Sequence, residues 1–339
     1  MNLRPEEFFQ AAHDCFLSRV ASHEIYHREI GVAGLNCRIE STAEWRGLFR
    51  ALDHLPVVSS AAPSLTIRAW QGAIPRVPWS AADYGQRGLI RGFNDSRFST
   101  VFDHATNSLS MLDRENRIAL FWTRTINNLP NHIRSAPLRT IFGWWLEAHG
   151  RILIHAGAVA KQNRAVLLIG PGGSGKSTAA LLCLKTGWKY LADDYCVVDQ
   201  SEGNDLPTVF SLYQTAKISK DWLSRLNVIE SDASEPVDNK QLIFVDEIFP
   251  DQMECSARCC AGLLPIVSKE MRTGIVPATN GEAVRALAPT SMFQNAMAAE
   301  PAFRLIVRFV VRLPIARLQL GQNLDEIPRQ IDNHLRMVP

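Results

Sequence analysis

A glycine-rich segment in the second half of the chain constrains the fold more than any other feature. The segment from Gly170 to Ser177 reads GPGGSGKS and satisfies G-x-x-x-x-G-K-[ST], a pattern in which glycines let backbone N–H groups face a phosphate. An apolar run from Ala165 to Ile169 precedes it, and a stretch rich in Ala and Leu, from Lys176 to Thr186, follows it. This order predicts a buried strand, a phosphate-binding loop and a helix with a positive N-terminus.

The residue types in this loop suit a nucleoside triphosphate. Lys176 supplies positive charge for the β- and γ-phosphates, and the Ser177 hydroxyl is a hard oxygen ligand for Mg²⁺. We therefore expect ATP and Mg²⁺ as cofactors. The other residues expected to contact the nucleotide are Gly170, Gly172, Gly173, Ser174, Gly175 and Thr178.

A pair of aspartates follows the next strand-like run. The run from Trp188 to Ala192 comes directly after Gly187, a residue suited to ending the preceding helix, and it delivers Asp193 and Asp194. In an open parallel sheet, ligands collect at the carboxyl ends of the strands, so we expect the pair beside the phosphate loop. The repulsion between the two carboxylates is relieved if one binds Mg²⁺ and the other accepts a proton. A solvated turn is the alternative interpretation.

Two further side chains are candidates for the site. His155 follows the apolar run from Ile152 to Ile154 and should stand at the end of a neighbouring strand, although a purely structural histidine would give the same pattern. Lys217 is a candidate contact for the substrate or for the transferred phosphate, with a solvated lysine as the alternative.

A second acidic pair competes with the first. The apolar run from Gln241 to Val245 ends in Asp246 and Glu247, the arrangement of the metal-and-water strand in motor-type ATPases. If Asp246 bound the metal and Glu247 activated water, the protein would hydrolyse ATP instead of phosphorylating a hydroxyl. A nucleotide-binding regulatory module without any transfer is a third alternative.

Length and patterning predict two domains. A chain of 339 residues exceeds the usual size of one hydrophobic core, and the pattern changes near Gly150. We expect an N-terminal α+β domain over residues 1–149, with an accessory or substrate-binding role, and an α/β catalytic domain over 150–339. In the first domain, strands are expected at Ser64–Trp70, Phe98–Phe102 and Arg117–Thr123, and a helix at Ala136–His149 whose Trp144 and Trp145 pack in a core.

The net charge and the cysteine content indicate which classes of partner and which cellular compartment to expect. A formal charge of +2, from 36 basic and 34 acidic residues, gives no field that would favour nucleic acid or a membrane as the main partner. The start lacks the pattern of a signal peptide, and the seven scattered cysteines do not suggest a disulfide framework. We therefore expect a cytoplasmic protein, with its oligomeric state left open and a homo-oligomer among the alternatives.

Taken together, three motifs resemble the HPr kinase/phosphorylase superfamily, bacterial serine kinases built on a compact P-loop domain. They are His155-Ala156, the loop from Gly170 to Thr178, and the run from Leu191 to Asp194, and the resemblance covers about Ile152 to Asp199. It implies that Asp193 handles the acceptor proton together with His155, and that the carboxylates lie near Mg²⁺. With Asp193 in that role, we expect Asp194 to be the metal ligand beside Ser177.

The chain also departs from true HPr kinases. It lacks the arginine- and glycine-rich signature that follows the aspartate pair there, so neither HPr as a substrate nor the reverse reaction is implied. The segments from Ser211 to Lys217 and from Leu287 to Phe293 look like a divergent branch found beside lasso-peptide biosynthesis genes. That likeness implies a peptide or small-protein substrate whose acceptor is a serine, at the C-terminus of a lasso-peptide precursor.

Overall fold

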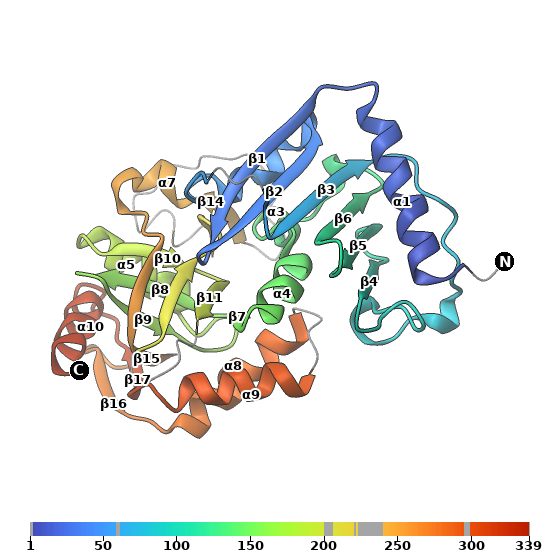
Figure 1. Ribbon diagram of the computed structural model, residues 1–339. Coiled ribbons are helices and arrows are strands. Elements are labelled where there is room, and N and C mark those ends of the chain that lie inside the picture. The colour runs from blue at the N-terminus through green and yellow to red at the C-terminus, as the bar shows by residue number, and fades with distance from the viewer. Residues whose placement is uncertain are drawn as a thin grey trace. The chain divides into compact units, whose positions relative to one another are not determined.

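The computed structural model describes residues 3–58, 62–199, 206–219, 222, 240–294 and 299–338. The chain divides into two compact units (Figure 1). One comprises Met1–Arg50 and Leu55–Trp145, and the other comprises Ala51–His54 and Leu146–Pro339. The roles that we assign to the two parts remain predictions. In the part of the chain that the structure describes, no helix combines the length and apolar composition needed to cross a membrane.

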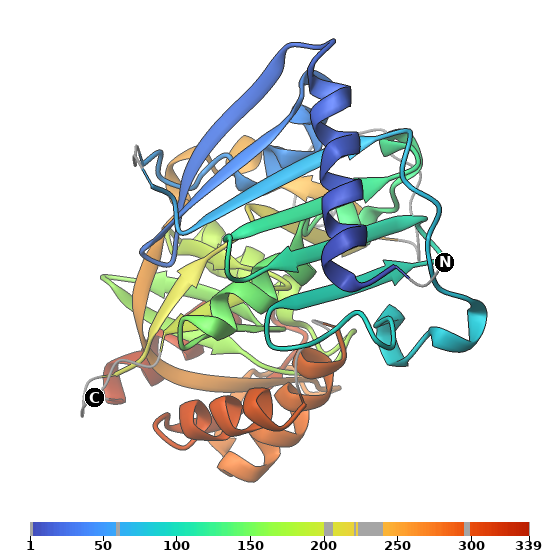
Figure 2. The ribbon, with the colours of Figure 1, turned by 45° about the vertical axis from the view of Figure 1, so that its right-hand side comes forward.

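The first unit is a mixed sheet covered by one long helix. Its described residues form six strands in the order β1-β2-β3-β6-β5-β4, in which β3 pairs in parallel with β2 and β6. The bounds are β1 (Ile25–Val32), β2 (Leu35–Thr42), β3 (Leu65–Gln71), β4 (Phe98–Asp103), β5 (Ser108–Asp113), β6 (Ile118–Thr123), α1 (Pro5–Val20), α2 (Arg46–Phe49) and α3 (Asn131–Arg134). Helix α1 lies across one face of the sheet (Figure 2), where Phe8, Phe16 and Trp70 are buried.

Local patterns predicted several of these elements. The expected strands at Ser64–Trp70, Phe98–Phe102 and Arg117–Thr123 are β3, β4 and β6 to within one residue. The helix expected at Ala136–His149 is α4 (Arg139–Ala148). It begins three residues later because Leu138 has a left-handed φ of 61°, which a right-handed helix does not contain.

The second unit is built on a larger mixed sheet. Within the described residues it has nine strands, with a main order of β10-β8-β9-β15-β12-β11-β7, and β17 pairs with β15 and β16. The strands are β7 (Arg151–Ile154), β8 (Gly157–Lys161), β9 (Arg164–Leu168), β10 (Lys189–Ala192), β11 (Cys196–Asp199), β12 (Thr208–Ser211), β15 (Ser256–Val267), β16 (Gly274–Pro277) and β17 (Ile315–Leu320). A separate ribbon pairs β13 (Thr215–Ser219) with β14 (Lys240–Phe244).

The expectation of an open parallel sheet is wrong. Among the described strands of this sheet, the parallel pairs are β9 with β15 and β15 with β17, and the other pairs are antiparallel. Short connections explain the difference, because parallel neighbours need a long crossover and hairpins do not. Gln162 and Asn163, with φ of 54° and 60°, form a two-residue turn that sends the chain from β8 back along β9.

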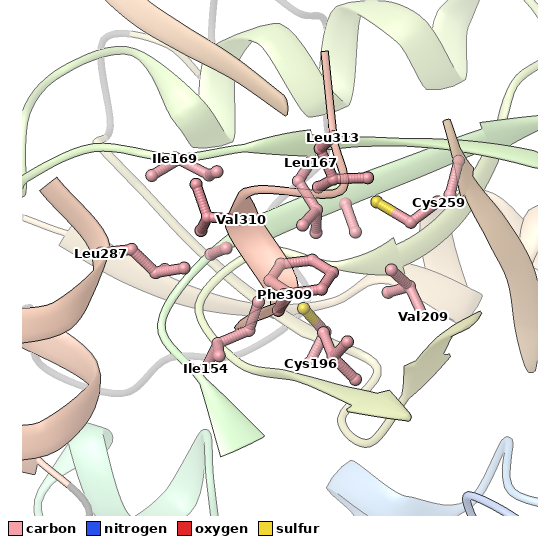
Figure 3. Packing of buried hydrophobic residues seen from close by; sticks show 14 of the residues in the cluster. Ile154, Leu167, Ile169, Cys196, Val209, Cys259, Leu287, Phe309, Val310 and Leu313 are labelled. Carbon is pink, nitrogen blue, oxygen red and sulfur yellow. The ribbon is translucent and has the colours of Figure 1, made fainter. Parts of the chain in front are cut away.

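Helices cover both faces of the larger sheet. Residues of β9 alternate between two buried clusters, with Ala165 and Leu167 in one and Val166 and Leu168 in the other. The first cluster contains residues of α8 (Asn280–Gln294) and α9 (Ala299–Val310), as Figure 3 shows for Leu287 and Phe309. The second contains residues of α5 (Lys176–Lys185) and α10 (Glu326–Met337). A strand buried on both faces therefore leads into the glycine-rich loop.

The two aspartates lie in a gap between two strand pairs, where the pairing of β8 with β10 ends and the pairing of β7 with β11 begins. We call this gap the break in the ribbon. Strands β8 and β7 are consecutive in the chain, and they pair antiparallel with β10 and β11, which are consecutive as well. The pair of Ala192 with Ala158 and the pair of Cys196 with Ile154 share one register across the break, and the register shifts by one residue further back, between Tyr190 and Ala192. Residues 193–195 consequently face residues 155–157. The pairing of two strands, and not a parallel sheet, brings the aspartates to the histidine.

Candidate active site

The glycine-rich loop has a backbone that side chains would obstruct. It joins β9 to α5, and Gly173 and Gly175 adopt left-handed φ angles of 81° and 100°. A Cβ on Gly170 would come within 2.7 Å of the Ser174 hydroxyl oxygen, and a Cβ on Gly175 would overlap Leu320. Glycine at these positions therefore lets the backbone turn closely over the start of α5.

The loop lines a cavity of about 660 Å³ that also contains acidic and basic side chains. Most of the predicted site residues line this cavity: Gly172, Gly173, Gly175, Lys176, Ser177, Thr178, His155, Asp194 and Lys217. Gly170, Ser174 and Asp193 do not line it, and Asp193 is buried with an exposed fraction of 2%. Segments that are distant in sequence thus meet around one space whose volume is typical of small-molecule sites.

Lys176 is buried and bonds to the loop itself. Its Nζ donates hydrogen bonds to the backbone carbonyls of Gly170, at 2.8 Å, and Pro171, at 3.0 Å. Burial lowers the pKa of Lys176, and the negative charges of Asp193 and Asp194 act in the opposite direction. The carbonyls hold the ammonium group inside the loop, where phosphate oxygens could replace them.

Asp193 is a carboxyl group whose charge is disfavoured. Burial raises its pKa to about 6, with a further increase from the neighbouring charge of Asp194, against hydrogen bonds from Ser177 and from the backbone of Lys217. The Lys217 N–H donates to Asp193 Oδ2 at 2.9 Å. Asp193 Oδ1 is buried and has no hydrogen-bond partner among the described residues. A carboxyl group with this pKa can both accept and release a proton near neutral pH.

The pKa of Asp194 is shifted in the opposite direction, so its charged form is favoured. Burial opposes its ionisation, but hydrogen bonding to His155 and the charge of Lys217 hold its pKa well below the usual range. Lys217 Nζ lies 2.6 Å from Asp194 Oδ2, and His155 Nε2 lies 3.6 Å from Oδ1. Two adjacent carboxyl groups therefore differ sharply in proton affinity, the arrangement by which acid–base roles are divided within an active site.

His155 is held from two sides. Its backbone N–H donates a hydrogen bond to the Ser291 hydroxyl at 2.9 Å, and its ring lies 5.3 Å from the ring of Tyr195. Ser291 belongs to α8 and is buried, with an exposed fraction of 1%. Sequence reasoning singled out the segment from Leu287 to Phe293, which contains Ser291, but placed no residue of it in the site, because no local pattern indicates the contact with His155.

Lys217 comes from the small ribbon of β13 and β14. Tyr190 of β10 fixes this ribbon by donating a hydrogen bond from its buried hydroxyl to the Thr215 carbonyl at 2.7 Å. Lys240, at the start of β14, also lines the cavity and was not among the predicted site residues. The ribbon therefore presents two lysines to the space in front of the loop.

The second acidic pair is not part of this cavity. Asp246 and Glu247 lie in α7 (Val245–Ile248), and neither is among the described residues that line the cavity. The preceding strand, β14, pairs with β13 and lies outside the nine-stranded sheet. The two tryptophans of α4, Trp144 and Trp145, are buried with exposed fractions of 4% and 3% and do not line the cavity.

Comparisons with known proteins show distant similarity among solved structures. No protein-family model matches the chain, and no curated protein matches it. Among solved structures, the chain is similar to the Hpr(Ser) kinase/phosphatase from Coxiella burnetii, with 13% sequence identity and a TM-score of 0.30. The match covers 55% of this chain and 97% of that chain. A TM-score this low does not assign the chain to that family.

Proposed function

We propose that the cavity binds ATP and that the protein transfers its γ-phosphoryl group to a serine hydroxyl of a peptide or small protein. One observation carries the proposal: two carboxyl groups of opposite proton affinity, Asp193 and Asp194, adjoin a glycine-rich loop that bears Lys176 and Ser177. Phosphoryl transfer to a hydroxyl needs these elements together: donors for the phosphates, a carboxylate near the cation and an acceptor for the proton.

The loop and the first turn of α5 account for the phosphates. Backbone N–H groups at the start of a helix attract anions, and the glycines leave them uncovered. On nucleotide binding, Lys176 would exchange the carbonyls of Gly170 and Pro171 for oxygens of the β- and γ-phosphates. The exchange keeps the ammonium group hydrogen-bonded throughout, so it does not leave a buried charge without partners.

The cavity also fits Mg²⁺. Ser177 supplies a hydroxyl oxygen and Asp194 an ionised carboxylate, and both line the cavity. Within the described residues, no group of three or more His, Cys, Asp and Glu side chains is arranged to hold a metal, so phosphate and water oxygens would complete the coordination. When bound, Mg²⁺ would neutralise charge on the β- and γ-phosphates.

In the roles that the sequence predicts, Asp193 would then accept the proton of the attacking serine, which requires the serine to reach a carboxyl group that is 2% exposed and does not line the cavity. The serine oxygen forms a bond to the γ-phosphorus, the bond from that phosphorus to the bridging oxygen breaks, and ADP leaves. A pKa of about 6 leaves Asp193 mostly ionised at neutral pH while keeping it basic enough to take the proton. His155, beside Asp194, would orient that carboxylate, and Lys217 would contact the transferred phosphate or a carboxylate of the substrate.

Two features of the site favour the opposite assignment of roles, in which the aspartates exchange metal binding and proton acceptance. Ser177, the expected Mg²⁺ ligand, lowers the pKa of Asp193, whereas Asp194 lines the cavity with His155 Nε2 3.6 Å from its Oδ1. In that arrangement Asp193 would support the metal and Asp194 would receive the proton. Both versions use the same pair, and they differ in which single substitution spares nucleotide binding.

The experiment is a transfer assay with mass-spectrometric detection. The protein is incubated with ATP, Mg²⁺ and peptides that end in serine, and in parallel with ATP alone. Gain of one phosphoryl group on a peptide supports the kinase, and phosphate release without peptide supports the ATPase that would use Asp246 and Glu247. ATP binding without either product supports the regulatory module. A C-terminal serine of a lasso-peptide precursor is the first acceptor to test.

A further inference from the structure

The second unit includes a short segment from the N-terminal half of the chain. Ala51–His54 belongs to this unit, whereas the chain up to Arg50 and from Leu55 to Trp145 belongs to the first unit. Ala51 and Leu52 are fully buried. We call the segment Ala51–His54 the strap. Four residues from the N-terminal half are therefore part of the unit that contains the candidate active site.

The strap contacts the connection between β12 and β13. The Gln214 N–H donates a hydrogen bond to the Ala51 carbonyl at 2.9 Å. His54 Nε2 lies 2.7 Å from the Ser211 hydroxyl oxygen, to which it is hydrogen-bonded. Cys255 Sγ lies 3.9 Å from the His54 carbonyl oxygen, and the Ser211 N–H donates to the Cys255 carbonyl at 2.9 Å. The strap thus holds the connection at both of its ends, residue 211 and residue 214.

The residues that the strap holds are buried. Ser211 and Gln214 each have an exposed fraction of 1%. A polar group buried to this extent cannot turn to water when it loses its partner, so the loss costs free energy. The hydrogen bonds from the strap therefore fix the position of the connection.

The same connection is the root of the ribbon formed by β13 and β14. The Gln214 carbonyl accepts a hydrogen bond from the Val245 N–H at 2.8 Å, directly after β14 ends. The next carbonyl, of Thr215, accepts the hydrogen bond from the Tyr190 hydroxyl at 2.7 Å. The root is consequently held from two directions, by the strap and by β10.

Only a short length of strand separates this root from the aspartate pair. Lys217 follows Gln214 by three positions, and it contacts Asp193 through its N–H and Asp194 through its Nζ. Three residues of an extended strand span about 10 Å. A displacement of about 1 Å at the root would therefore be felt at Lys217, and an error of that size in a catalytic group can cost about 10²-fold in rate.

We propose that the strap positions the active site and that His54 is a positioning residue. Through Ser211, His54 fixes the root of the ribbon, and the ribbon keeps Lys217 in contact with Asp193 and Asp194. The consequence for phosphoryl transfer rests on the proposed function, whereas the consequence for the ribbon does not.

Hydrogen exchange followed by mass spectrometry measures the ribbon directly in the full-length protein. The peptide over residues 212–219 contains the amide of Gln214, which bonds to Ala51, and the amide of Lys217, which bonds to Asp193. Exchange of these amides reports local opening of the ribbon root and does not require any activity of the protein.

Variants on both sides of the contact form a double-mutant cycle. His54→Ala and Ser211→Ala should each accelerate exchange of the 212–219 peptide about 5- to 10-fold, the scale of one lost hydrogen bond. The double variant should exchange no faster than either single variant, because both substitutions remove the same interaction. His54→Gln should restore slow exchange, since an amide can also hydrogen-bond to the hydroxyl.

Two comparisons separate a local effect from a general loss of stability. His27→Ala is the matched control, because this histidine of β1 is 56% exposed and belongs to the first unit, and its exchange over 212–219 should match the unmodified protein. The peptide over residues 164–168, in the buried strand β9, should exchange equally slowly in every variant.

Kinetics test the catalytic consequence. In the transfer assay, His54→Ala should lower kcat about 10-fold, and His54→Gln should recover most of it. Calorimetry should give a Kd for a non-hydrolysable ATP analogue within about twofold of the unmodified protein, because Lys176 bonds to loop carbonyls and not to the strap.

Each remaining outcome contradicts a stated part of the proposal. Unchanged exchange over 212–219 in both single variants, or equal acceleration over 164–168, overturns the positioning of the ribbon by the strap. Additive effects in the double variant overturn the contact of His54 with Ser211 as the means. Accelerated exchange with unchanged kcat overturns the catalytic consequence. Absence of any phosphorylated peptide with the unmodified protein contradicts the proposed function, and the exchange results still decide whether the strap holds the ribbon.

Discussion

The side chain of Lys217 lies 2.6 Å from the carboxylate of Asp194, while the backbone N–H of the same lysine donates a hydrogen bond to Asp193. One residue of β13 thereby holds both members of the aspartate pair by different groups. A side-chain substitution removes the first contact and leaves the second in place, so Lys217 can be tested without releasing Asp193.

Lys217→Ala is expected to lower phosphoryl transfer by about 10- to 100-fold, the scale of a lost hydrogen bond to a charged group. If Lys217 contacts the transferred phosphate, kcat falls, and if it contacts a carboxylate of the acceptor, KM for the peptide rises. Steady-state kinetics with varied peptide separate the two. Lys185→Ala, an exposed lysine at the end of α5, is the control, and unchanged kinetics in Lys217→Ala would show that Lys217 has neither role.

Lys176→Ala is expected to remove nucleotide-dependent activity by a factor of about 10² to 10³, because a positive group aimed at the phosphates is lost. Circular dichroism and thermal unfolding should show a folded protein, since the lysine bonds to loop carbonyls and not to the apolar core. Retention of full turnover by a folded Lys176→Ala protein would refute the central role of the loop.

Single substitutions in the aspartate pair distinguish the two assignments of proton acceptor and metal ligand. If Asp193 is the proton acceptor, Asp193→Asn keeps ATP and Mg²⁺ binding but lowers transfer by about 10² to 10⁴, whereas Asp194→Asn weakens the Mg²⁺-dependent part of nucleotide affinity. Reversed roles exchange these two outcomes. Calorimetry with a non-hydrolysable ATP analogue and the transfer assay distinguish them.

Glu247→Gln belongs in the same series as the test of the rival acidic pair. The kinase proposal expects this variant to retain transfer, because Glu247 does not line the cavity. Loss of activity in Glu247→Gln alone, with both aspartate variants active, would transfer the catalytic assignment to Asp246 and Glu247.

Stability should depend on pH through Asp193. Its pKa rises from 3.8 to about 6 on folding, so the folded state favours the protonated form. The associated stability is complete below pH 3.8 and is lost as the pH rises through about 6, by up to about 3 kcal/mol at 1.36 kcal/mol per unit. Without metal or nucleotide, the unfolding free energy of the unmodified protein should fall relative to Asp193→Asn between these pH values. Parallel curves from denaturant titrations would contradict the shift.

Two loop glycines should respond differently to alanine. Gly175→Ala places a side chain at a φ of 100° and against Leu320, so we expect a loss of about 1–3 kcal/mol of unfolding free energy. Gly172→Ala meets no atom within 4 Å, and φ there is not left-handed, so its stability should change by less than about 0.5 kcal/mol. Thermal unfolding of the pair measures the difference, and equal values would refute the packing argument.

Local features of the site could be predicted from the sequence. The strand expected at Ala165–Ile169 and the helix expected at Lys176–Thr186 are β9 and α5 to within one residue, and Gly187 has the expected left-handed φ, 84°. These elements depend on apolar runs, glycine and helix propensity, all of which act over a few residues.

Features that depend on distant pairing could not be predicted. Asp246 follows a run that resembles a central strand, yet that run pairs with β13 outside the larger sheet, and no local pattern encodes the partner of a strand. Ser291 reaches His155 across 136 positions of sequence.

The break in the ribbon sets the tolerance of this site to insertions and deletions. Ala158 to Ile154 and Ala192 to Cys196 span equal numbers of residues, so the gap itself holds no extra residue on either side, and the one-residue shift of the pairing lies before it, between Tyr190 and Ala192. Adding one residue on one side alone would rotate the following strand by half a period and turn its buried side chains outward. A compensating insertion in both strands would preserve the pairing but move His155 away from the aspartates. Evolution can therefore vary the loops around the cavity in length, whereas the places of His155 and of the aspartates within the gap are fixed by the residues that pair on either side of it.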